Sequence, residues 1–151
     1  MRPRTRAREL ALQYLFSLDF QGPEALDGLE AFLKSSGASR TVREFSTLLV
    51  RGVIEHQADI DPHIRGAAEN WALERIAKVD RNILRLAVFE LSYAPSTPAT
   101  VVIDEAVELG KRYSTAQSGA FVNGVLDRIV ERIGRKPRKT AGDPSPNQNA
   151  P

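Results

Sequence analysis

The chain has 151 residues, which is long enough for one domain with a buried hydrophobic core. Hydrophobic residues make up 42% and charged residues 26% of the sequence, with a net charge of +2, which is typical of a globular protein. No apolar run is long enough to cross a membrane, and the absence of cysteine excludes disulfides, zinc fingers and thiol nucleophiles. The basic N-terminus lacks the apolar segment of a secretory signal, so we expect a cytoplasmic protein.

The apolar spacing in the first half of the chain is helical. A first helix is expected from about Arg4 to Asp19, and a second is expected to start at Pro23 and to end at Gly37. Ser39 can cap a third, long helix. The Asp61-Pro62 pair combines a capping residue with a first-turn proline, so it predicts a new helix running to about residue 70.

The second half continues the same period. Helices are expected from about Val79 to Tyr93, from Pro98 with Thr97 as its cap, and from about Ala116 to Ile133. The β-branched run at residues 100–103 could form a strand, but it has no partner strand and the helical period continues past it. The sequence therefore predicts an all-α domain of about seven helices over residues 1–133. Residues 134–151 carry no large apolar side chain and are expected to form a basic disordered tail.

Motifs of catalysis are missing from the sequence. There is no Walker-type phosphate loop, no G-x-G-x-x-G segment after a strand and no G-x-S-x-G elbow. His56 and His63 lie near acidic residues, but their spacing matches no zinc pattern, and the break expected at Asp61-Pro62 would place them on two helices. We therefore predict no enzyme activity, no metal and no cofactor.

Positive charge is concentrated at the two ends of the chain. Residues 1–8 carry +4, residues 9–133 carry −5 and residues 134–151 carry +3. Basic ends on an acidic body favour contact with nucleic acid, although short basic termini are also common without that role. Within the first segment, Arg4 and Arg8 would share one face of a helix and Arg6 would point elsewhere, whereas an extended arm could lay all three along a phosphate backbone.

The start of the last helix offers a second place for an anion. Lys111 and Arg112 precede Gln117 and Ser118, which lie where backbone N–H groups at a helix start are free. Phe121 could stack on a base or pack in the core.

Two other features have structural interpretations: Gly124 inside a helix indicates a close helix crossing, and Arg85 is expected to form an internal salt bridge with Glu90 or an acid on the next helix.

The same segments carry a resemblance to a known family. The motifs are RARELALQ at residues 6–13, DRNILRLAVFEL at 80–91, IDEAVEL at 103–109 and FVNGVLD at 121–127. Their residue types and order are similar to those of the NusB transcription antitermination family over about residues 4–133. The resemblance implies a fold of two small helical bundles. It also implies a non-enzymatic function, which is the binding of the single-stranded boxA element of nascent RNA together with a small-subunit ribosomal protein, NusE.

The resemblance also implies roles for individual residues. The expected complex acts on RNA polymerase to suppress termination, notably on ribosomal RNA operons. The residues implied to contact RNA are Arg4, Arg6 and Arg8 at the start and Gln117, Ser118 and Phe121 on the last helix, with Lys111 and Arg112 added from the anion argument above. Phe16 and Asp80 fall where the family meets its ribosomal-protein partner.

The chain differs from some members of the family at one position, and two alternative functions stay open. Some family members have an acid where Gln117 stands, so Gln117→Asp is expected to lower boxA affinity. NusB-like domains also occur fused to RNA methyltransferases, and this chain has no room for the catalytic domain, so it could be a substrate-binding module of that kind. A protein-binding scaffold with incidental arginines is the other alternative. The sequence does not decide between a monomer and a homodimer.

Overall fold

The computed structural model describes residues 1–69 and 72–135, and these residues form six α-helices without strands. The helices are α1 (Pro3–Gln21), α2 (Leu29–Ser35), α3 (Arg40–Ala67), α4 (Lys78–Tyr93), α5 (Ala99–Tyr113) and α6 (Ser118–Arg132). Short 3₁₀ helices cover Pro23–Gly28 and Leu73–Arg75. The all-α prediction is confirmed, and the β-branched run at residues 100–103 lies in α5.

The number of helices was overestimated by one, because α3 continues through Asp61 and Pro62. Proline inside a helix removes one backbone hydrogen bond and costs about 3 kcal/mol. Burial offsets this cost, since Ile60 and Ile64 lie on the buried face of α3 on either side of the proline. The Asp61 carboxylate is bound by Arg85 of α4 instead of capping a new helix.

Most predicted helix ends agree with the structure to within two residues. The Ser39 side chain accepts a hydrogen bond from the backbone N–H of Val42 at 3.3 Å, so the predicted cap of α3 is confirmed. Thr97 does not cap α5, because the helix starts one residue later than expected, with Pro98 at the cap position. Of the predicted tail, only Gly134 and Arg135 are described; residues 136–151 lie outside the described part.

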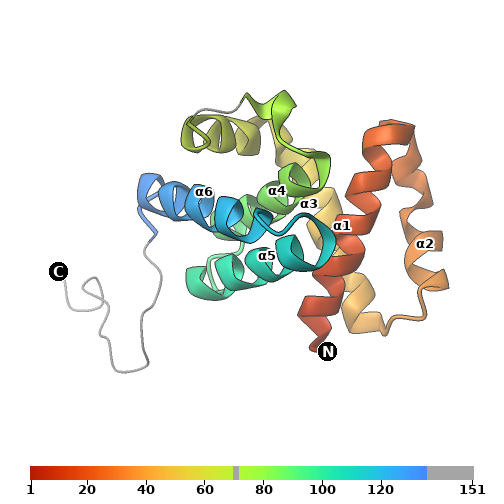
Figure 1. The fold of residues 1–151 in the computed structure, drawn as a ribbon. Helices are drawn as coiled ribbons and strands as arrows, with labels where there is room; N and C mark the ends of the chain where they lie inside the picture. The colour runs from red at the N-terminus through yellow and green to blue at the C-terminus, as the bar shows by residue number, and fades with distance from the viewer. Residues whose placement is uncertain (70–71, 136–151) are drawn as a thin grey trace, which may run out of the picture.

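The helices fall into two groups, with α1 and α2 on one side of the molecule, α4, α5 and α6 on the other, and α3 between them (Figure 1). Helix α1 packs on α3 and α4, while α5 and α6 pack on each other and on α4. The buried side chains of the groups form one continuous hydrophobic core. This core fixes the position of the N-terminal turn of α1 relative to α5, which matters for the charged residues considered below.

The close helix crossing predicted at Gly124 is absent. A Cβ atom at Gly124 would meet an Arg128 side-chain nitrogen at 3.9 Å, which is ordinary contact. The close approach is at Gly52 of α3 instead, where a Cβ atom would lie 2.2 Å from the ring of the buried Phe89 of α4. Glycine at residue 52 therefore allows α3 and α4 to pack closely.

Candidate nucleic-acid interface

The arginine-rich start of the chain is helical and does not form an extended arm. Helix α1 begins at Pro3, whose missing N–H costs nothing at the first helical position. Arg4 and Arg8 lie one turn apart and both face the Phe45 ring, with their guanidinium carbons 4.3 and 5.7 Å from its centroid. Arg6 points away from them toward Glu9. The predicted separation of these arginines onto two faces is confirmed.

Arg8 is buried in an ion-pair network and cannot reach a ligand at the surface. Its Nε and Nη2 donate to the two carboxylate oxygens of Glu90 at 2.7 and 2.8 Å, and its Nη1 donates to Glu105 at 3.1 Å. Burial lowers the pKa of Arg8, but the hydrogen bonds and charges of the two glutamates outweigh it and raise the pKa overall. Because Arg8 is 4% exposed, we remove it from the residues predicted to contact RNA.

Arg6 and Arg112 converge on Glu9, which is buried. Arg6 Nη1 lies 3.3 Å from Glu9 Oε1, and Arg112 Nη1 is paired with Glu9 Oε2. The Glu9 side chain is 3% exposed, while those of Arg6 and Arg112 are 38% and 50% exposed. Burial raises the pKa of Glu9, but hydrogen bonds from Tyr113, Arg112 and Arg6 outweigh it and lower the pKa overall. Two accessible guanidinium groups are thus held side by side by one carboxylate, with a net charge of +1.

The end of α5 and the start of α6 carry the second predicted group. Lys111 is exposed and lies 3.4 Å from Glu108, one turn earlier on α5. Gln117 is exposed at the N-cap of α6 and makes no side-chain capping hydrogen bond. Ser118 is 2% exposed, and its hydroxyl lies 2.8 Å from the Ser114 hydroxyl. Lys111 and Gln117 are therefore available to a ligand, whereas the Ser118 side chain is not.

A pocket of about 420 Å³ lies between the start of α4 and the start of α6. Phe121 is half-buried on its wall, together with Ser118 and Asp80. Ser118 donates to Asp80 Oδ2 at 3.0 Å, and Asp80 Oδ1 is buried without a hydrogen-bond partner among the described residues. The structure thus joins a residue predicted to contact RNA to one predicted to contact a protein partner, and both carry buried side chains.

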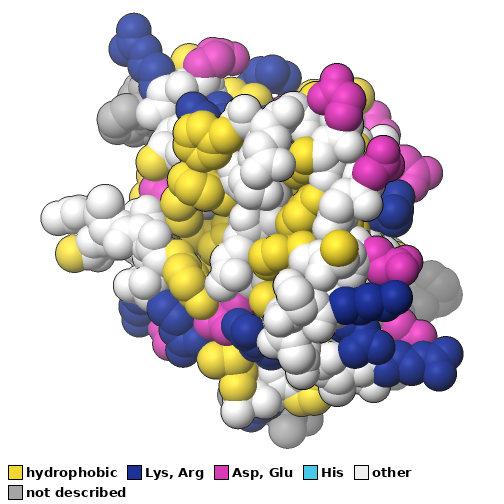
Figure 2. Space-filling model, turned by 90° about the vertical axis from the view of Figure 1, so that its right-hand side faces the viewer, with side chains coloured by type: hydrophobic (Ala, Val, Ile, Leu, Met, Phe, Trp, Pro, Cys, Tyr) yellow, Lys and Arg dark blue, Asp and Glu magenta, His cyan; other side chains and the backbone are white. Residues whose placement is uncertain are grey.

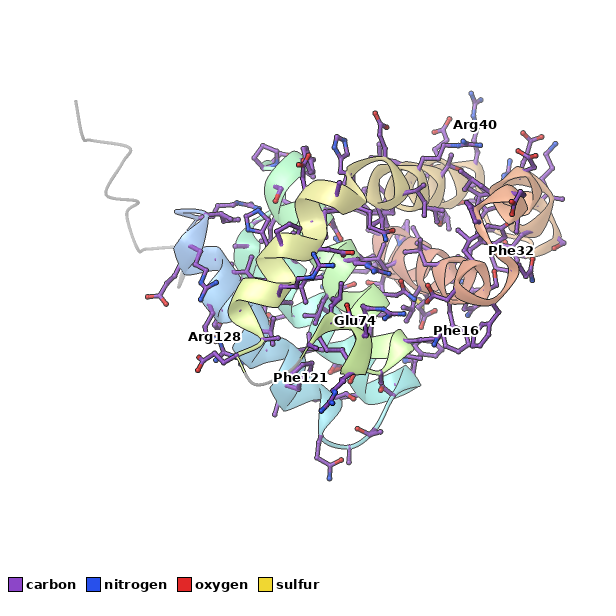
Figure 3. All side chains as sticks on the ribbon, turned by 90° about the horizontal axis from the view of Figure 1, so that it is seen from above. Phe16, Phe32, Arg40, Glu74, Phe121 and Arg128 are labelled. Atoms are coloured by element: carbon purple, nitrogen blue, oxygen red, sulfur yellow. The ribbon has the colours of Figure 1, made fainter. Side chains whose placement is uncertain are left out.

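Phe16 lies on α1, on the same side of the molecule as Phe121 (Figure 3). Its half-buried ring is 5.0 Å from that of Phe20, which is 66% exposed. Lys78 of α4 lies 5.7 Å from the Phe20 ring. Sequence reasoning missed Phe20, although the spacing of four residues from Phe16 places both on one helix face. Figure 2 shows hydrophobic side chains across the middle of the α1–α2 side of the molecule, and Lys and Arg side chains interspersed with acidic ones around its edge.

The remaining candidates have structural partners. Arg85 forms the predicted internal salt bridge, but its partner is Asp61 of α3, while Glu90 pairs with Arg8. His56 and His63 lie on the same helix, contrary to the prediction, and the His56 ring stacks on Tyr93 at 3.9 Å. Among residues 1–69 and 72–135, no group of metal-ligating side chains is close enough to hold an ion. No helix in this part of the chain is long and apolar enough to cross a membrane.

Comparison with known proteins identifies the family. The profile of the NusB family matches residues 5–131. Transcription antitermination protein NusB of Sorangium cellulosum is 47% identical over 138 residues, which cover 91% of this chain and 99% of that protein. Its counterpart in Anaeromyxobacter dehalogenans is 51% identical over 131 residues, which cover 86% and 92% of the two chains. The chain belongs to the NusB family. It is therefore a transcription antitermination factor and not an enzyme.

Solved structures of NusB-family proteins share the fold. T. maritima NusB is 40% identical with a TM-score of 0.79, and the match covers 86% of this chain and 92% of that one. A crystal structure of the antitermination factors NusB and NusE in complex with dsRNA contains a chain that is 30% identical. That match has a TM-score of 0.79 and covers 87% of this chain and 98% of the other.

On this NusB-family fold, the predicted site residues separate into three sets. The accessible arginines are Arg6 and Arg112, which Glu9 holds together, and Arg4, which lies on the other face of α1 toward Phe45. Lys111, Gln117 and Phe121 line the surface around the start of α6. Arg8, Asp80 and Ser118 are buried, with Arg8 bonded to Glu90 and Ser118 bonded to Asp80. These hydrogen bonds hold the helices together beneath the accessible residues.

Proposed function

We propose that this NusB-family chain binds the single-stranded boxA element of nascent RNA, notably from ribosomal RNA operons. It does so jointly with the ribosomal protein NusE, and the complex acts on RNA polymerase to suppress termination. The family assignment supports the antitermination role. The relative that was crystallised with NusE and dsRNA supports RNA and NusE as partners.

The observation that carries the RNA proposal is the pairing of Arg6 and Arg112 on the buried Glu9. A guanidinium group has five N–H donors, so each arginine keeps donors for a phosphate after its contact with Glu9. Their attachment to a fixed carboxylate also reduces the entropy that each side chain loses on binding. Arg4 adds a third exposed cation on the other face of the first turns of α1. These are the contacts that we assign to the RNA backbone.

We assign the protein partner to the aromatic face formed by Phe16 and Phe20. Exposed aromatic side chains are typical anchors of protein interfaces. The buried Asp80 acts there through Ser118, by holding the start of α6 against the start of α4. Lys78, at the start of α4, lies near the Phe20 ring, and the start of α4 also borders the pocket lined by Phe121, which supports adjacent surfaces for the protein partner and the RNA.

Replacing both Arg4 and Arg6 by Ala is expected to weaken boxA binding by about tenfold, since each exposed ion pair contributes up to about 1 kcal/mol and about 1.4 kcal/mol corresponds to a factor of ten. The plot of log K against log salt concentration should become less steep by about 1.4, at 0.7 per phosphate contact. Fluorescence anisotropy with boxA and scrambled RNA, with and without NusE, measures both quantities.

The control for this experiment is Arg51→Ala with Arg65→Ala, which removes the same charge from exposed positions of α3. It should leave boxA affinity nearly unchanged. If neither RNA binds to the unmodified chain even with NusE present, the proposal is wrong and a protein-binding scaffold is the better description.

Gln117→Asp is expected to weaken boxA binding about two- to fivefold, which is the effect of a few tenths to 1 kcal/mol typical of one exposed charge. Gln117 is the N-cap of α6, and Asp is a preferred residue there, so thermal stability should stay the same or rise. Gln117→Asn is the neutral control and should keep wild-type affinity. Unchanged or tighter binding by the Asp variant would place Gln117 away from the RNA.

A further inference from the structure

Tyr113 is the last residue of α5, and 36% of it is exposed to solvent. It directly follows Lys111 and Arg112 in the sequence, and α6 begins five residues later at Ser118. Tyr113 therefore lies between the two accessible sets of residues described above, the arginine pair held by Glu9 and the surface around the start of α6.

The hydroxyl group of Tyr113 is used inside the protein. It donates a hydrogen bond to the buried carboxylate of Glu9 and accepts one from the side chain of Gln13. Burial, together with the hydrogen bond to Glu9 and the charge of that carboxylate, raises the pKa of Tyr113, so the hydroxyl keeps its proton and stays a donor at neutral pH. The exposed part of Tyr113 that remains for a ligand is its aromatic ring.

The same carboxylate fixes this ring beside two accessible cations. Glu9 pairs with Arg6 at 3.3 Å and with Arg112. The three groups come from two helices, since Arg6 lies on α1 while Arg112 and Tyr113 lie on α5. Because all three converge on one buried group, the ring and the guanidinium groups are neighbours with restricted positions before a ligand binds, which lowers the entropy cost of binding.

An exposed ring beside guanidinium groups fits one nucleotide of a single strand. The unstacked bases of single-stranded RNA bind to the faces of aromatic side chains, while basic side chains follow the phosphates. Reading the edge of a base would need a free polar group, but the polar atom of Tyr113 is already bonded to Glu9 and Gln13. The ring can therefore hold a base by its face alone.

We propose that the Tyr113 ring is the stacking platform for the base of the nucleotide whose phosphate binds Arg6 and Arg112. Every base offers a face for stacking, so this contact adds affinity for single strands and little preference among bases. The inference rests on the RNA binding proposed above. It adds a contact of a different kind to that site, with a base instead of a phosphate.

Tyr113→Leu removes the ring and is expected to weaken boxA binding about tenfold, which lies within the range for the loss of one stacked base. The plot of log K against log salt concentration should keep its slope, because no phosphate contact is lost. Tyr113→Phe keeps the ring and should retain most of the affinity. Fluorescence anisotropy with the full chain, NusE and boxA RNA measures the affinity and the slope.

A fluorescent base reports on the stacking itself. 2-Aminopurine, whose emission depends on stacking, is placed at one boxA position at a time. At one position, its emission in the complex should change with Tyr113→Leu and stay at the wild-type level with Tyr113→Phe. Tyr93→Leu is the matched control, since Tyr93 also ends a helix and is 42% exposed. It should leave both the affinity and the emission unchanged.

Failure of this inference differs from failure of the proposed function. If Tyr113→Leu keeps the wild-type affinity while the unmodified chain prefers boxA, the ring does not stack on a base and the proposed function stands. If Tyr113→Leu makes the salt slope less steep, or Tyr113→Phe loses as much affinity as Tyr113→Leu, the residue only holds Glu9 and the arginines, and the stacking inference is wrong. If the unmodified chain binds neither boxA nor scrambled RNA with NusE present, the proposed function itself is wrong.

Discussion

Replacing Arg8 with Met is expected to lower the free energy of unfolding by about 3–5 kcal/mol, which is the usual cost of breaking a buried ion pair from one side. The change leaves Glu90, which is 2% exposed, without the bidentate partner that neutralises its charge. Glu105 would keep its hydrogen bond from the Thr5 hydroxyl at 2.7 Å but would also lose Arg8. Urea denaturation followed by circular dichroism measures the loss.

The matched control is Arg4→Met, one turn away on the same helix face. Because Arg4 is exposed, its removal should change stability by less than about 1 kcal/mol. When Arg8→Met is combined with Glu90→Met, much of the stability should return, since both buried charges are then absent. An Arg8→Met protein that is fully stable but has lost boxA affinity would show that Arg8 contacts RNA after all.

Arg8 shows that the burial of a charged side chain could not be predicted from the sequence. Arg4, Arg6 and Arg8 have the same local context, and the helical period correctly separated their faces. The difference in burial depends on Glu90, which is 82 residues away in the sequence. Glu90 meets Arg8 only because α1 packs on α4. The helices themselves could be predicted because apolar residues recur at helical spacing within their own segments. Long-range charge pairs leave no such local pattern.

The Asp61-Pro62 pair shows the opposite case, in which a valid local signal is overruled. Asp followed by Pro fits a helix start, and without the rest of the protein a break would be the favoured outcome. The structure keeps α3 continuous because Arg85 Nε and Nη2 bind the two Asp61 oxygens at 2.9 and 3.0 Å. The motif at residues 80–91 contains Arg85, but nothing in it identifies Asp61 as the partner.

Asp61→Ala is accordingly expected to destabilise the protein by about 3–5 kcal/mol, since it leaves Arg85, which is 7% exposed, as an unpaired buried charge. Arg85 would retain a hydrogen bond of 3.5 Å to the Asn82 side chain, which is too long to replace the pair. Urea denaturation measures the loss, and Glu55→Ala, at an exposed position of α3, serves as the control.

The helical signal of the native state separates the two roles that Asp61 could have. If Asp61 acts as the partner of Arg85, its removal should lower the unfolding midpoint but change the native ellipticity at 222 nm little. As the cap of a separate helix, its removal would reduce the ellipticity and cost only about 1 kcal/mol. Asp61→Leu combined with Arg85→Met should recover most of the lost stability, because apolar side chains then fill the space of the ion pair. No recovery in this double variant would contradict the ion-pair explanation for the continuity of α3.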